Sequence, residues 1–97
     1  MSAVGSSKFP HIFAEDMTDE MCSKAIAVSQ EAFELNISKG HVFSTIASHI
    51  RFAFDKEYKK GWNVVVGRSF GAYVTHEIKT YMYFTVVPGV YILLWRA

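Results

Sequence analysis

The spacing of hydrophobic residues changes once along this chain, at Gly61, and that change limits the folds that the sequence can adopt. Before Gly61, apolar residues recur every three or four positions over two segments, as on the buried face of a helix. After Gly61, the chain has short β-branched and aromatic runs bounded by glycines, which are typical of strands. This order predicts an α+β domain in which two helices pack on one face of an antiparallel β-sheet.

The first helix is expected from Asp19 to Leu35. Thr18 is a suitable N-cap, and the acidic residues that follow it favour the positive end of the helix dipole. Cys22 falls on the apolar side of this helix, so we interpret it as a small core residue rather than a nucleophile. A second helix is expected from Val42 to the sequence KKG at residues 59–61, with Arg51, Lys56 and Lys59 facing water.

Four strands are expected after the second helix, at Trp62–Gly67, Phe70–His76, Ile78–Val87 and Val90–Arg96. The Val-rich run Trp62–Gly67 is typical of an interior strand. The pair Pro88-Gly89 predicts a tight turn between the last two strands. Phe9–Ala14 is a candidate fifth strand, and Pro10 confines its start to an edge or a lead-in because proline has no backbone N–H to donate.

Residues 1–7 are small and polar enough to form a flexible tail, which leaves 8–97 as one domain. No export signal is recognisable, and the apolar run Val86–Trp95 is interrupted and too short to span a bilayer. With one cysteine, a reducing compartment is favoured. Apolar residues make up 51% of the chain and aromatic residues 15%. Because a chain of this length has little interior, part of that apolar surface is expected to contact another chain.

Catalysis and metal binding find little support in the sequence. His76 and Glu77 are neighbours, so on a strand they point to opposite faces and cannot act as a pair. The spacings of the four histidines match no zinc motif: they are His11, His41, His49 and His76. No serine or cysteine lies in a recognised nucleophile motif. We therefore expect no enzyme activity, no metal and no cofactor.

Nucleic-acid binding is also disfavoured. The sequence RSFGAYV has some likeness to an RNA-recognition signature. However, Phe70 and Tyr73 fall on opposite sides of the strand, so they cannot form one stacking platform. The formal net charge is only +1. Neither nucleic acid nor a membrane surface is an expected partner.

Several segments together resemble the cytoplasmic dynein light chain family of the small, eight-kilodalton type. They are DMTDEM at 16–21, AFDKEY at 53–58, Trp62, VGRSFGAYVTHE at 66–77 and VYILLWR at 90–96. The likeness covers roughly residues 12–96. Its most specific part is 67–77, which departs from the family pattern only at Ser69 and Ala72.

The resemblance implies a homodimer in which the strand around Phe70–Thr75 crosses over and joins the partner's sheet. A linear peptide, from the dynein intermediate chain or another protein, then adds as an antiparallel strand in a groove at the dimer boundary. The implied function is that of a motor subunit or dimerisation adaptor in the cytoplasm and cytoskeleton. The implied groove residues are Arg68, Ser69, Phe70, Gly71, Ala72, Tyr73, Val74, Thr75 and His76, with Tyr83 and Leu93 on the groove floor and Asn63 and Tyr73 in the dimer interface.

Three departures from the family bear on function. A Glu-Lys pair that holds a glutamine of the bound peptide is replaced here by Phe43-Ser44 at the groove entrance. A histidine that usually lies on the two-fold axis is replaced by Asn63. The connection between the helices, around residues 36–41, is also longer. These changes leave an alternative open, namely a purely structural cytoskeletal dimer whose groove has altered or lost peptide specificity.

Overall fold

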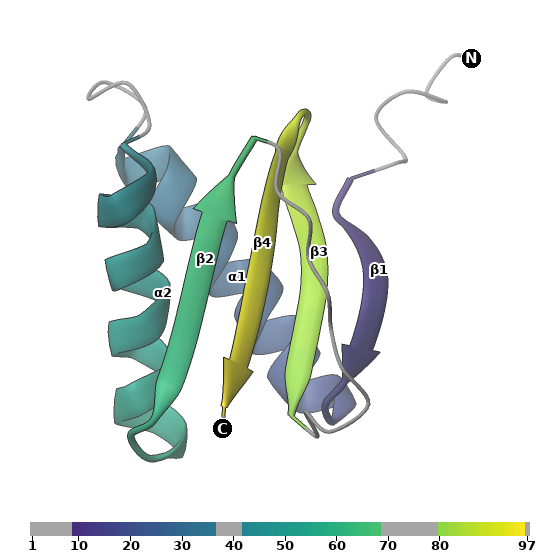
Figure 1. The fold of residues 1–97 in the computed structure, drawn as a ribbon, viewed down its shortest axis with the longest axis vertical. Coiled ribbons are helices and arrows are strands. Elements are labelled where there is room, and N and C mark those ends of the chain that lie inside the picture. Colours follow the sequence, from purple (N-terminus) through teal and green to yellow (C-terminus); the bar gives the residue numbers. More distant parts are fainter. Residues whose placement is uncertain (1–8, 37–41, 69–79, 97) are drawn as a thin grey trace.

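The computed structural model describes residues 9–36, 42–68 and 80–96, which form helices packed against a sheet (Figure 1). The elements in chain order are strand β1 (His11–Asp16), helices α1 (Asp19–Leu35) and α2 (Phe43–Tyr58), and strands β2 (Trp62–Gly67), β3 (Tyr81–Val87) and β4 (Val90–Arg96). In Figure 1, α1 passes behind the sheet and α2 lies beside β2. The predicted fold class, two helices on an antiparallel sheet, is confirmed.

The four described strands are antiparallel and ordered β1-β3-β4-β2. β1 lies at one end of the described sheet, and Pro10 lies in the lead-in before it, because the strand begins and ends two residues later than expected. Among the described strands, β2 pairs with β4 alone, so its predicted interior position stays a prediction. A Val-rich composition indicates that the side chains of a strand are packed against other residues. One neighbouring strand and a helix are enough to provide that packing.

The first end of α1 is capped by Thr18, as the sequence predicts. The Oγ1 atom of Thr18 accepts a hydrogen bond from the backbone N–H of Met21 at 3.2 Å. At the other end, the buried Asn36 donates through Nδ2 to the carbonyl oxygen of Ala32 at 2.7 Å. The Thr18 bond satisfies a backbone N–H that has no partner inside the helix, and the carbonyl of Ala32 also accepts the backbone N–H of Asn36 at 3.2 Å. α1 begins and ends at the expected residues.

The turn between β3 and β4 is also as predicted. Val87 and Val90 are paired, with Pro88 and Gly89 between them. Gly89 has a φ of 76°, which a type II turn requires at its third position and which glycine adopts without steric cost.

An aromatic cluster joins the end of α2 to the start of β2. Phe54 is fully buried, and its ring centroid lies 4.8 Å from that of Trp62 and 5.1 Å from that of Tyr58. The Oδ1 atom of Asp55 accepts the backbone N–H of Trp62 at 3.1 Å. Arg96 donates through Nη1 to the carbonyl oxygen of Tyr58 at 3.1 Å. These contacts hold α2 at a defined position relative to β2, which matters for the site described next.

Candidate functional site

A groove of about 570 Å³ runs between α2 and β2. It is lined by Phe43, Ser44, Ala47, Ser48 and Arg51 from α2, by Asn63, Val64, Val65 and Val66 from β2, and by Trp95 from β4. The groove therefore combines one face of a helix with the last strand of the described sheet.

The helix side of the groove follows from the spacing of residues along α2. Ile46, Ile50 and Phe54 point into the core at helical spacing and are fully buried. The side chains that line the groove lie on a neighbouring face of the same helix, and those of Ala47 and Ser48 are small. Because small side chains leave room between the helix and the strand, the space stays open rather than filled.

The strand side of the groove offers backbone groups. β2 pairs with β4 along one edge, and no strand in the described part of the chain pairs with its other edge. An unpaired edge presents a row of backbone N–H and C=O groups that another strand can bind. The groove is thus able to receive an extended segment of polypeptide by β-strand addition.

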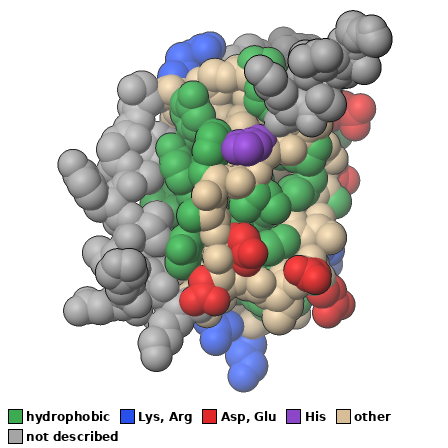
Figure 2. All heavy atoms as spheres, turned by 90° about the vertical axis from the view of Figure 1, so that its right-hand side faces the viewer, with side chains coloured by type: hydrophobic (Ala, Val, Ile, Leu, Met, Phe, Trp, Pro, Cys, Tyr) green, Lys and Arg blue, Asp and Glu red, His purple; other side chains and the backbone are tan. Residues whose placement is uncertain are grey.

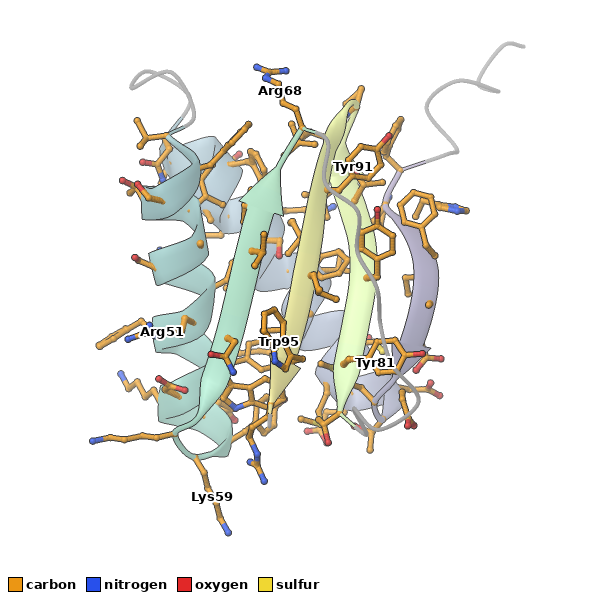
Figure 3. All side chains as sticks on the ribbon, in the orientation of Figure 1. Arg51, Lys59, Arg68, Tyr81, Tyr91 and Trp95 are labelled. Carbon is orange, nitrogen blue, oxygen red and sulfur yellow. The ribbon has the colours of Figure 1, made fainter. Side chains whose placement is uncertain are left out.

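Four residues predicted for the groove or the interface lie at this site. Phe43 and Ser44 line one end of the groove, and Asn63 lines it near the start of β2. Arg68 directly follows β2, and its guanidinium carbon lies 5.6 Å from the centroid of the Phe43 ring. Figure 3 shows Arg68 beyond the end of β2 and Arg51 farther along α2.

The two predicted floor residues are brought together, but on the sheet face opposite the helices. Tyr83 of β3 is paired with Leu93 of β4, and Leu93 is paired with Val65 of β2. Leu93 is buried and Tyr83 is half-buried. Neither lines the groove, whereas Val65 belongs to both surfaces and makes them continuous.

Aromatic side chains dominate that sheet face, which we call the open face. Tyr81, Tyr91 and Trp95 lie along it in Figure 3. The ring centroid of Phe13 lies 5.1 Å from that of Tyr83 and 5.8 Å from that of Tyr91. The β1 edge, which faces the viewer in Figure 2, also carries hydrophobic side chains, with acidic side chains around them. An apolar surface such as the open face is typical of a protein–protein contact.

The remaining predicted residues cannot be placed. Ser69, Phe70, Gly71, Ala72, Tyr73, Val74, Thr75 and His76 lie outside the described residues, as do Ile78 and Lys79 of the predicted third strand. The crossing of this segment to a partner therefore stays a prediction, and so does the role of Tyr73 in the interface. The predicted tail is likewise outside the described part of the chain.

Several residues of the site were not singled out from the sequence as groove residues. Ala47, Ser48 and Arg51 lie one and two turns after Phe43 and Ser44, so helical periodicity alone would have placed them on the same face. Phe13 and Tyr91 carried no comparable signal, because their contact depends on the pairing of β1 with β3 and of β3 with β4.

The perturbed titrations lie away from the groove. Burial, and then the negative charge of Glu15, raise the pKa of the Cys22 thiol above 9.0, which agrees with its interpretation as an inert core residue. Burial, and then Glu20 and Glu57, raise the pKa of Tyr58. Among the described residues, no three His, Cys, Asp or Glu side chains are grouped to hold a metal ion. No helix in the described ranges is long and apolar enough to cross a membrane.

Comparisons with known proteins agree with one another. A family model described as dynein light chain type 1 matches residues 10–97. Over 75 residues, the chain is 41% identical to the cytoplasmic dynein light chain of Emericella nidulans. The aligned region covers 77% of this chain and 76% of that protein.

Two solved structures share the fold. The dynein light chain-like domain of the Fasciola hepatica calcium binding protein FhCaBP2 has a TM-score of 0.78 at 18% identity and covers 91% of this chain and 90% of that one. The dynein light chain-like domain of CsTAL3 has a TM-score of 0.68 at 13% identity and covers 91% of this chain and 92% of that one.

Proposed function

Because the chain belongs to the dynein light chain family, we propose that it is a non-catalytic, homodimeric light chain that binds linear peptide segments of partner proteins by β-strand addition. It would act as a dynein motor subunit or as a dimerisation adaptor, and segments of the dynein intermediate chain are among the expected ligands. The relative from Emericella nidulans is named a cytoplasmic protein, and we assign this chain to the cytoplasm and its cytoskeleton.

Dimerisation is supported by two surfaces that one chain leaves available. The outer edge of β2 has no partner strand among the described residues, and residues 70–75 of a second chain would pair with it. The open face supplies apolar area for the same contact through the exposed side chains of Phe13 and Val65. By two-fold symmetry each chain would give and receive one strand.

The observation that carries the peptide-binding proposal is the groove between α2 and β2. A partner's strand that paired with β2 would in turn offer its own outer edge, to which the peptide would add as one more strand beside α2. The small side chains of Ala47 and Ser48 leave room for that peptide. Backbone pairing would provide affinity, and the side chains at the groove wall would provide specificity.

A matched pair of substitutions tests this proposal. Ala47→Tyr fills the groove, whereas Ala27→Tyr adds the same side chain to an exposed position of α1. A peptide selected from a displayed library of random linear peptides would be titrated into each protein by calorimetry. We expect one peptide per chain, and binding at least about tenfold weaker for Ala47→Tyr only, since a tenfold change corresponds to about 1.4 kcal/mol.

Two outcomes would contradict the proposal. Equal affinity for the Ala47→Tyr and Ala27→Tyr proteins would place the peptide elsewhere. Failure to select any peptide would favour the alternative, a purely structural cytoskeletal dimer, which Phe43-Ser44 at the groove entrance makes worth testing.

Gly71→Val is expected to abolish peptide binding without loss of the fold, because a side chain there would crowd the incoming strand.

A further inference from the structure

We propose that the groove selects peptides that carry an acidic side chain, and that Arg68, held over the ring of Phe43, is the residue that binds it. This inference rests on the proposed function, since it concerns the ligand of the same groove. It assigns the groove a chemical preference, for aspartate or glutamate, at the end where α2 begins and β2 ends.

The charge of the groove points to an anionic ligand. Of the described side chains that line it, Arg51 is charged and none is a carboxylate. Arg68 adds a second guanidinium at the Phe43 end. The hydroxyl groups of Ser44 and Ser48 lie between them along α2 and can donate hydrogen bonds. An acidic segment would therefore meet complementary charge, whereas a basic segment would be repelled.

The geometry of Arg68 makes it the specific element. Its guanidinium carbon lies 5.6 Å from the ring centroid of Phe43, a cation–π contact that restricts the side chain. A guanidinium over a ring keeps N–H donors free, and two of them match the two oxygens of a carboxylate. Within residues 9–36, 42–68 and 80–96, no carboxylate lies in ion-pair range of Arg68.

A carboxylate fits this end of the groove better than an amide. A glutamine or asparagine side chain offers one acceptor oxygen and also carries two donors, which have nothing to bind on a guanidinium. A carboxylate offers acceptors on both oxygens. The preference is therefore for the charged side chain over its neutral isostere.

Arg51 contributes charge but is partly neutralised. Its Nε atom lies 4.0 Å from Oδ2 of Asp55, at the limit of an ion pair, and its side chain is 65% exposed. Asp55 is held in place because its other oxygen accepts the backbone N–H of Trp62. Arg51 therefore supports the positive sign of the groove, while the specific contact is assigned to Arg68.

The experiment begins with selection of random linear peptides on the full-length protein at low salt. The best peptide that contains Asp or Glu, and the same peptide with that residue changed to Asn or Gln, are then titrated into three proteins. They are the wild type, Arg68→Gln and the control Lys56→Gln, which removes the same charge from an exposed position of α2 outside the groove.

We expect the acid-to-amide change to weaken binding about fivefold for the wild type and for Lys56→Gln, the size of a good exposed ion pair. For Arg68→Gln, the two peptides should bind equally. Equal binding of both peptides to the wild type would overturn the inference, and so would a preference for the acidic peptide that persists in Arg68→Gln.

The selection also separates this inference from the proposed function. Peptides that bind in the groove without any enrichment of Asp or Glu would contradict the inference alone and leave peptide binding intact. If no peptide is selected, the proposed function fails, and the inference fails with it.

Discussion

Two phenylalanines on α2, separated by one residue, provide a direct test of how this helix is held against the sheet. Phe54 is fully buried between α2 and β2, in contact with Trp62 and Tyr58. Phe52 is 72% exposed. The same substitution, phenylalanine to alanine, therefore removes a core side chain at one position and a surface side chain at the other.

Phe54→Ala should lower the free energy of unfolding by about 3–5 kcal/mol, because it removes buried apolar area and leaves a cavity next to Trp62. That is a large share of the roughly 5–15 kcal/mol by which small domains are stable. Phe52→Ala loses little burial and gains helix propensity, so we expect a change within about 0.5 kcal/mol.

Urea unfolding followed by circular dichroism would measure both effects. With a slope of about 1–3 kcal/mol per molar, the midpoint for Phe54→Ala should fall by roughly 2 M, and that for Phe52→Ala should stay almost unchanged. All proteins must be compared at one concentration, because the unfolding of a dimer depends on concentration. Similar losses at the two positions would refute the assignment of Phe54 as the contact that fixes α2.

Three further predictions concern capping, the buried thiol and the interface. Thr18→Ala should cost about 1 kcal/mol in urea unfolding, since it removes the acceptor for Met21, and no measurable loss would contradict the cap. Because burial, and then Glu15, raise the pKa of Cys22, the unfolded chain loses the thiol proton at lower pH than the folded chain. The free energy of unfolding should therefore fall as pH rises past 9.0, and it should fall less steeply for Cys22→Ala. Equal slopes for the two proteins would disprove this. With Asn63 in place of histidine, the dimer dissociation constant from sedimentation equilibrium should change little between about pH 7.5 and 5.5. For Asn63→His, the dimer should become weaker as the pH falls over that interval. A hundredfold weakening of the wild-type dimer would contradict the argument.

The bounds of the helices were predictable because local chemistry decides them. Thr18 accepts a hydrogen bond at the start of α1, and Asn36 donates one at its end, so both signals act within a few residues. The position of β2 in the sheet was not predictable in this way. The amino-acid composition of a strand indicates how its side chains are packed. The number of strands that pair with it depends on residues far away in the sequence.

The register of β3 against β4 shows a second limit. Counting back from the paired Val87 and Val90 would place Tyr83 opposite Leu94, which faces the helices. An irregularity between Phe84 and Val87 shifts the pairing by one residue, so Tyr83 lies opposite Leu93 on the open face. A shift of one residue exchanges the two faces of a strand, and turn chemistry alone does not reveal it.

The groove shows a third limit. Through a family resemblance, Phe43-Ser44 was predicted for its entrance and Asn63 for the dimer interface, but the residues in its middle were not predicted. Ala47 and Ser48 matter because they are small, and a small residue on a helix gives no sign in the sequence of whether it faces a cavity, a neighbour or water.

The most direct test of the account is the mass of the protein in solution without peptide. One chain has a mass of 11.0 kDa. The proposed function assigns a second chain to its open face and to the edge of β2 with which no described strand pairs. Sedimentation equilibrium at micromolar concentration should give twice the mass of one chain, as expected for a symmetric dimer. A mass of 11.0 kDa at that concentration would contradict strand exchange, and with it a peptide groove at a dimer boundary.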